Sequence, residues 1–386
     1  MGIVKIDGIE WDNVVKVSGI AKSSIAKVVG CTVPSVGATK LVACFDDAYV
    51  SYVPIADEGA VADWENNMYQ ARNGDNWDIT DIAVGKDGNG DEFYVAVVNS
   101  NNPEIIHDDD GDITDGQQWT EINLGTGGLS GNLKQRTVLW GNDVWVSAGM
   151  LGSSDKYIYR STDGSSWSAV DISGLPDIGD VYSNGIYALT SDGDSNWWFG
   201  VGEKIYKSTN NASAWALEHT LSGTIIQDLV YTNDTVVALV NDTGGSVAAM
   251  ASAAALDTKD WSGLMQLSDS SGATMHQSRT KRMAGGDGRV VCIDWNNTLA
   301  VNVDGKTIAV TGSRADPGEE GNLNCICTDG GGNWWVGADG GSTAADGGDI
   351  CKSEDNGLSW TRTVEGINKS GDRKVEGIAT DVYLPV

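Results

Sequence analysis

The sequence predicts an all-β protein, a seven-bladed β-propeller of four-stranded antiparallel blades that follows a short arm of β-repeats. Seven related segments recur at intervals of 42 to 52 residues, and each interval has room for four short strands with their turns. A second repeat, with a period of 11 residues, occupies the N-terminus. The 386 residues include 50 glycines and 15 tryptophans, which is typical of many turns between short strands with large aromatic side chains.

Residues 1–36 form the predicted arm. It contains three similar runs, at residues 3–9, 14–20 and 25–31, with lysines at positions 5, 16 and 27 and glycines at positions 8, 19 and 30. Such short units cannot bury a face alone, so we expect them to stack on each other or on a partner. Eleven residues also make three helical turns, but the β-branched runs and the repeated glycine favour strands.

Residues 37–386 form the predicted propeller, and its clearest repeat is a Ser-x-Asp-x-Gly-x-x-Trp segment. Ser353, Asp355, Gly357 and Trp360 match this pattern at every defined position. Drifted copies supply Asn73 with Trp77, Asp163 with Trp167, Asn210 with Trp215, and Asp304 with Ile308, while Trp119 and Trp261 end two looser copies. We expect the Asp or Asn to accept turn amides, the glycine to adopt a conformation other residues avoid, and the tryptophan to fold back between neighbouring sheets.

Other residues are expected to serve the core and to close the ring. The pairs Trp197-Trp198 and Trp334-Trp335 lie in predicted strands whose two faces are both covered, so we expect burial. The six cysteines lack CxxC spacing and the chain has only three histidines, which favours free buried thiols over zinc. Residues 375–383 look like a further strand that pairs into the first blade.

Three segments leave their role open. The alanine-rich stretch 247–256 is expected to form a short helix or a lid loop, and the insertion 54–67 with its Trp64 precedes the first repeat; both are candidates for partner contact. Asp87, Asn89 and Asp91 have the spacing of calcium-binding oxygen ligands, but the closing carboxylate about seven residues later is missing. A solvated hairpin turn is therefore the favoured interpretation, with calcium as the alternative.

The repeated segments resemble Asp-box, or BNR-repeat, propellers, and the resemblance covers roughly residues 38 to 386. That family contains enzymes such as sialidases as well as non-enzymes, and the resemblance implies boxes at the blade periphery, so no catalytic residue is carried over. The arm resembles runs of the Ile-x-Lys-Val-x-Gly type that begin structural proteins of tailed phages. Together the two resemblances imply a virion component of the tail, fibre or capsid. Its arm would anchor it to other virion proteins, and its propeller would serve decoration or bind a host-surface glycan or receptor.

Charge and motifs narrow the remaining function classes. With 25 basic and 54 acidic residues the formal net charge is −29, which argues against nucleic acid or an anionic membrane as partner. The N-terminus lacks the apolar core of a signal peptide, so we expect synthesis in a host cytoplasm and assembly into a virion. The chain has no Arg-Ile-Pro motif of the sialidase type. We therefore expect a non-enzyme without a cofactor.

Two further hypotheses are kept beside this one. The main alternative is a carbohydrate-binding or glycan-cleaving propeller that acts on host surface polysaccharide. Glycoside hydrolysis needs only two carboxylates at a suitable separation, and 54 acidic residues leave room for such a pair without nominating one. An intracellular assembly factor is the third hypothesis.

Overall fold

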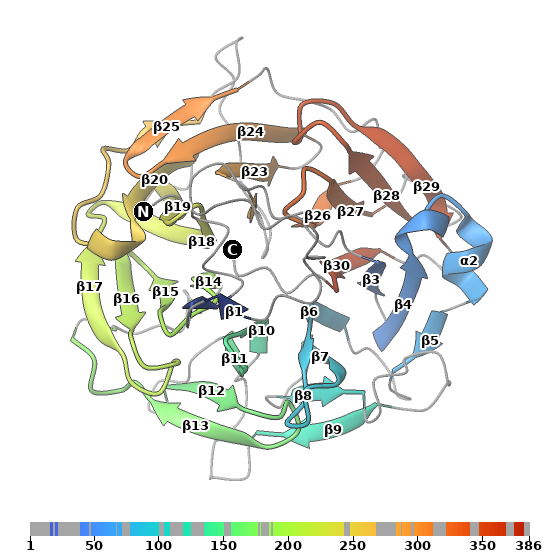
Figure 1. Ribbon diagram of the computed structural model, residues 1–386, viewed down its shortest axis with the longest axis horizontal. Coiled ribbons are helices and arrows are strands. Elements are labelled where there is room, and N and C mark those ends of the chain that lie inside the picture. Colours follow the sequence, from blue (N-terminus) through green and yellow to red (C-terminus); the bar gives the residue numbers. More distant parts are fainter. Residues whose placement is uncertain are drawn as a thin grey trace.

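The computed structural model is a ring of seven four-stranded antiparallel sheets (Figure 1), which confirms the predicted fold. The structure describes residues 16–17, 20–21, 39–45, 48–66, 68–71, 78–99, 104–108, 119–124, 135–149, 156–176, 178, 185–186, 188–242, 248–267, 283–286, 288–294, 297–311, 322–339, 347–367 and 374–381. No helix in this described part is both long and apolar enough to cross a membrane.

Each sheet is one blade, and within a blade the strands run from the axis of the ring to its rim. Blade 1 consists of β30 (Val375–Thr380), β3 (Lys40–Phe45), β4 (Tyr49–Pro54) and β5 (Met68–Gln70). Blade 2 consists of β6 (Asp78–Lys86), β7 (Glu92–Asn99), β8 (Glu104–His107) and β9 (Thr120–Asn123). Blade 3 consists of β10 (Gln135–Gly141), β11 (Val144–Gly149), β12 (Tyr157–Ser161) and β13 (Trp167–Asp171).

The other four blades have the same order. Blade 4 consists of β14 (Ala188–Ser191), β15 (Trp197–Val201), β16 (Lys204–Ser208) and β17 (Ala216–Thr220). Blade 5 consists of β18 (Thr224–Thr232), β19 (Thr235–Asp242), β20 (Ala248–Ala254) and β21 (Met265–Gln266). Blade 6 consists of β22 (Met283–Gly286), β23 (Arg289–Asp294), β24 (Asn297–Asp304) and β25 (Thr307–Val310). Blade 7 consists of β26 (Leu323–Thr328), β27 (Trp334–Ala338), β28 (Gly348–Ser353) and β29 (Thr361–Ile367).

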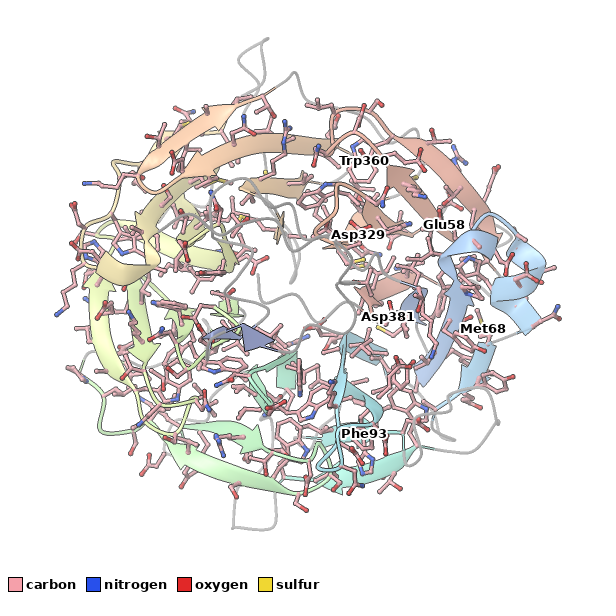
Figure 2. The ribbon with its side chains drawn as sticks, viewed as in Figure 1. Glu58, Met68, Phe93, Asp329, Trp360 and Asp381 are labelled. Atoms are coloured by element: carbon pink, nitrogen blue, oxygen red, sulfur yellow. The ribbon has the colours of Figure 1, made fainter. Side chains whose placement is uncertain are left out.

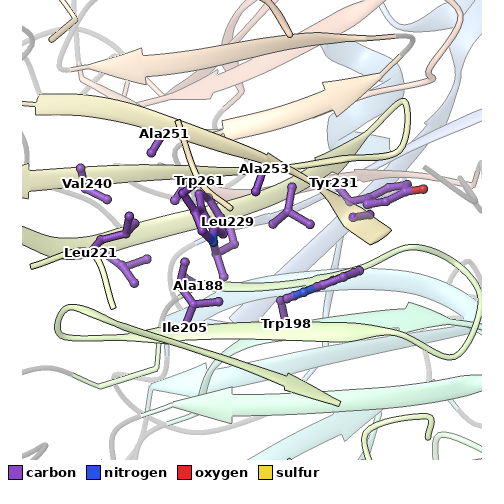
Figure 3. Close-up of a cluster of buried hydrophobic side chains, with 14 of the residues drawn as sticks. Ala188, Trp198, Ile205, Leu221, Leu229, Tyr231, Val240, Ala251, Ala253 and Trp261 are labelled. Atoms are coloured by element: carbon purple, nitrogen blue, oxygen red, sulfur yellow. The ribbon is translucent and has the colours of Figure 1, made fainter. Parts of the chain in front are cut away.

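The core lies between the blades. Figure 3 shows one such layer, in which Trp261 from blade 5 faces Trp198 and Ile205 from blade 4. The paired tryptophans are buried as predicted, and because neighbours on a strand point to opposite faces, each pair serves two layers: Trp197 packs toward blade 3 and Trp198 toward blade 5. One buried tryptophan removes roughly 200 Å² from water, worth up to about 5 kcal/mol before its ordering cost.

The two ends of the chain close the ring in blade 1. The C-terminal β30 pairs antiparallel with β3, with Ala43 opposite Ile378, which confirms the predicted closing strand. Ile378 is fully buried in the layer between blades 7 and 1. Just beyond β30, the Asp381 carboxylate (labelled in Figure 2) accepts hydrogen bonds from the Thr39 and Lys40 amides at 2.8 and 3.1 Å. The first blade is therefore held by hydrogen bonds between residues more than 300 positions apart.

The alanine-rich stretch was expected to be a helix or a lid loop, and this prediction is wrong. Residues Ala248–Ala254 form β20, which pairs with β19 over its whole length, and only Ala255–Asp257 form a 3-10 turn, η5. The reason is tertiary packing, which overrides the helical preference of alanine. Ala251 and Ala253 are fully buried in the layer that holds Trp261, where larger side chains would compete with the indole ring for space.

The insertion at residues 54–67 joins β4 to β5 at the rim of blade 1. It contains the 3-10 turn η3 (Ile55–Asp57) and the short helix α2 (Val61–Asn66), which contacts β29 of blade 7 (Figure 1). Its Trp64 is fully buried in the layer between these blades. The expected partner contact of this tryptophan is thus made within the chain. In the arm, β1 (Lys16–Val17) pairs with β2 (Ile20–Ala21).

Candidate functional site: the hairpin turns and the axial channel

The turn between β12 and β13 shows how the repeated segment is built. The Asp163 carboxylate accepts hydrogen bonds from the Ser165 and Ser166 amides at 2.9 and 2.6 Å and from the Ser161 hydroxyl at 2.9 Å. Burial raises the pKa of the Asp163 carboxyl, but these hydrogen bonds outweigh that effect and hold the pKa below its ordinary value. The Trp167 indole donates to the Gly164 carbonyl at 2.7 Å. The turn is a self-contained hydrogen-bonded unit.

The segment with the full pattern folds in the same way between β28 and β29. Asp355 accepts hydrogen bonds from the Leu358 and Ser359 amides at 3.1 and 2.8 Å, and the Ser353 hydroxyl accepts one from the Gly357 amide at 2.8 Å. Gly357 has φ = +79°, and an added Cβ would lie 2.5 Å from Val291 of blade 6. Both the conformation and the close approach therefore require glycine. Trp360 (Figure 2) packs into the same layer.

The drifted copies keep part of this geometry. Asn210 accepts the Ala214 amide at 3.0 Å and the Ser208 hydroxyl at 2.8 Å, while Trp215 is buried between blades 3 and 4. The copy with Asp304 is reduced to a short turn in which Asp304 is exposed and Ile308 packs in the tryptophan's place. Asn73 and Trp77 lie outside the described residues.

The topology corrects the position of the first copy. In the other six blades the repeated segment lies between the third and fourth strands, whereas residues 72–77 follow the fourth strand of blade 1. The equivalent tryptophan of blade 1 is Trp64, which donates to the Glu58 carbonyl at 3.0 Å, just as Trp261 of blade 5 donates to the Thr258 carbonyl at 2.5 Å. Both connections begin with a 3-10 turn. The buried tryptophan in an otherwise polar insertion was the signal that could have identified it.

The calcium-like loop is a hydrogen-bonded turn. The Asp87 carboxylate accepts the Asn89 and Asp91 amides at 2.8 and 2.9 Å and the Asn89 side-chain amide at 2.9 Å. Burial slightly opposes ionisation, but these bonds lower the pKa of Asp87 overall. Across the described ranges no group of three or more His, Cys, Asp or Glu side chains converges on one point. The five described cysteines are free and buried, as predicted; Cys31 lies outside the described residues.

The main cavity is the axial channel, with a volume of about 180 Å³. It is lined by the innermost strand of every blade. Each of β6, β10, β18, β26 and β30 has a register shift close to its N-terminal end. Because all inner strands run in the same direction, these β-bulges gather at one mouth of the channel. The residues that the register shifts leave unpaired are all polar: Thr80, Arg136, Gln227, Asn324 and Glu376.

Two buried carboxylates beside this mouth connect neighbouring blades. Asp81 is 1% exposed; its carboxylate accepts the Ile82 amide at 3.0 Å within its own strand, and the Val138 amide and Thr137 hydroxyl of blade 3, both at 3.1 Å. Asp228 repeats the arrangement three blades later, with Met283 as its partner in the next blade.

The distances in the second copy are close to those in the first. Asp228 accepts the Leu229 amide and the Met283 amide of blade 6, both at 2.8 Å. Sequence reasoning missed both aspartates, although the shared pattern Ile-x-Asp-Ile or Ile-x-Asp-Leu, at 79–82 and 226–229, was a usable signal.

A third polar contact joins blades 7 and 1. The Glu58 carboxylate (Figure 2) accepts the Trp335 indole N–H at 2.6 Å and pairs with the Lys352 ammonium at 2.7 Å. Burial lowers the pKa of Lys352, but its hydrogen bonds to Glu58 and Glu354 outweigh this and raise the pKa overall. The same ammonium lies 5.7 Å from the centre of the Trp335 ring, so the ion pair also has a cation–π component.

Fold and site together define a closed seven-bladed β-propeller whose polar groups join blade to blade. No protein-family model matches the chain, and no curated protein matches it. Among solved structures it is similar to an ancestral GH74 enzyme, with a TM-score of 0.50 and 12% identity over 85% of this chain and 47% of that chain, so it spans about half the enzyme's length. At this identity the likeness shows the fold alone.

Two smaller propellers are similar as well. YCF48 bound to a D1 peptide has a TM-score of 0.48 and 15% identity over 76% of this chain and 82% of that chain. The Cps50 (Swd1) propeller domain of Myceliophteria thermophila has a TM-score of 0.48 and 12% identity over 75% of this chain and 87% of that chain.

Proposed function

We propose that the protein is a non-enzymatic structural component of a phage virion, in which residues 1–36 anchor the chain to other virion proteins and the propeller serves decoration or host-surface binding. The observation that carries the non-enzymatic part is the engagement of the buried acids at the channel mouth. Asp81 and Asp228 accept backbone amides from two blades each, so they act as structural acceptors rather than as proton donors for a substrate.

The hairpin turns support the proposed relationship to Asp-box propellers. In the turns of Asp163 and Asp355 the carboxylate accepts two turn amides and the tryptophan three to five positions later packs between blades. These contacts stabilise hairpins at the rim, away from the channel, and they fit a role in the scaffold. A rigid closed ring with such turns suits a protein that must survive outside a cell.

Mass spectrometry of gradient-purified particles from a culture that produces the protein tests the virion role. We expect peptides from the whole chain in the particle fraction, at a copy number that fits a symmetric assembly. Absence from particles, together with a monodisperse monomer in solution, would refute the proposal. A glycan array with the purified full chain tests the alternative: selective binding would favour a carbohydrate-binding propeller, and release of a shortened product would overturn the non-enzymatic assignment.

A further inference from the structure

The outer strand of blade 6 differs from the other outer strands. An outer strand presents unpaired main-chain groups, and proteins protect such edges with charged side chains or by keeping the strand short. Four outer strands carry charges, namely Glu121 in β9, Asp171 in β13, Glu218 in β17, and Arg362 with Glu365 in β29. The outer strands β5 and β21 are only three and two residues long. β25 has four residues, Thr-Ile-Ala-Val, and no charge, in a chain with a net charge of −29.

The geometry of β25 leaves its outward main-chain groups available. The Thr311 amide donates to the Ala300 carbonyl at 3.1 Å, and alternate residues of an antiparallel strand face the same way. The N–H and C=O groups of Ile308 and Val310 therefore point away from β24. β25 is the last strand of its sheet, and no strand of the described part pairs with this edge.

The surroundings of β25 are apolar with an acidic margin. Val310 is 41% exposed, and Leu264 at the start of the neighbouring β21 is 50% exposed. These are two of the three large apolar side chains that the described residues expose. The exposed Asp304 and Asp260 lie in the turns below the two strands, and Lys306 joins the turns through a 2.6 Å ion pair with Asp260.

We propose that this edge accepts one strand from the N-terminal arm of a second copy of the chain. The arm supplies three strand-forming runs, and its own residues Lys16–Val17 and Ile20–Ala21 already pair as strands. Its charge is complementary, because residues 13–36 contain three lysines and no acidic residue, whereas residues 37–386 contain 51 acidic and 21 basic residues. The inference rests on the proposed anchoring role of the arm and names its partner.

The repetition within the arm favours other copies over its own propeller. Three similar runs suit three similar edges, and β25 is the one uncharged edge of this length in the described part of a copy. Several copies on a symmetric particle would present that edge repeatedly. Reach is sufficient, since 36 extended residues span up to about 120 Å.

A proline on the edge tests the proposal with the full chain. Val310→Pro removes only an outward N–H, so the fold should persist, while an incoming strand loses a hydrogen bond and meets the ring. The matched control is Ala169→Pro in β13. Its N–H also points outward, because the Ile172 amide bonds inward to Lys156 at 2.9 Å. Circular dichroism and the urea midpoint should be similar for both variants and the parent.

The readout is zero-length carbodiimide cross-linking in an equal mixture of ¹⁵N-labelled and unlabelled chains. In the parent and in Ala169→Pro we expect mixed-label cross-links between arm lysines and Asp304 or Asp260, and association measured by light scattering. Val310→Pro should weaken that association at least about tenfold. Proline at positions 6, 17 and 28 of the arm, replacing Ile6, Val17 and Val28, should have the same effect.

Three outcomes would overturn the inference: single-label cross-links only, equal association of Val310→Pro and the parent, or equal loss in both proline variants. Detection of the protein in particles despite any of these results would leave the virion role standing with a different partner for the arm. The two proposals therefore fail separately.

Discussion

Replacement of Asp81 by alanine separates a structural role of the channel acids from a catalytic or ligand-binding one. Asp81→Ala removes the acceptor of the Ile82 and Val138 amides, and both residues are at most 1% exposed. A buried N–H without a partner costs about 1–3 kcal/mol, which gives about 2–6 kcal/mol for two. Removing the buried carboxylate relieves part of its desolvation, so we expect a net loss of about 2–4 kcal/mol.

The assay is equilibrium unfolding in urea, followed by the fluorescence of the 15 tryptophans. Asp228→Ala should lower the midpoint to a similar degree, because Asp228 makes the same pair of amide contacts. Asp91→Ala is the control: its side chain is exposed, and we expect a change within about 0.5 kcal/mol. If Asp81→Ala unfolds at the same urea concentration as the parent, the acid is not a structural acceptor, and the reasoning behind the non-enzymatic proposal fails.

Three further predictions concern contacts between blades and turns. Glu58→Ala leaves the Trp335 indole without an acceptor and Lys352 with only one partner, and should cost about 2–4 kcal/mol in thermal unfolding; a Tm equal to the parent's would contradict this. The lowered pKa values of Asp163 and Asp355 contribute stability that is complete above the unfolded pKa of about 3.9 and is lost as pH falls through the folded pKa, so the double Asp→Asn variant should have a flatter stability curve below about pH 4. Deletion of β30 should abolish cooperative unfolding, whereas deletion of residues 1–30 should shift the midpoint little; similar effects would argue against ring closure by β30.

The blade number and the ring closure could be predicted because their signals are local and repeated. A turn with Ser, Asp and Gly bonds its own amides, so its sequence pattern survives wherever the turn occurs. Seven such segments at similar spacing therefore count the blades even when single copies drift. The paired tryptophans were predictable for a similar reason, because a propeller strand has both faces covered.

The first copy and the channel acids depended on contacts that no local pattern specifies. Residues 69–77 match the segment 159–167 by eye, yet the place of the blade tryptophan belongs to Trp64, which lies in an insertion with a 3-10 turn and a helix. Its partner layer comes from blade 7, far away in the sequence. Asp81 was hidden in the same way, since its acceptors' donors sit on a neighbouring blade 56 and 57 positions later.

The contact around Glu58 explains how the ring holds at its non-covalent seam. Blades 4 and 5 contain the same arrangement in neutral form: the Trp198 indole donates to the Thr258 hydroxyl at 3.4 Å, and those residues are 60 positions apart. At the seam the indole of Trp335 donates to a carboxylate at 2.6 Å across 277 positions, and Lys352 pairs with the same carboxylate. Joining chain ends has the larger loop-closure entropy. A charge-assisted bond is roughly twice as strong as a neutral one, so the stronger version occurs where the chain's own continuity contributes least.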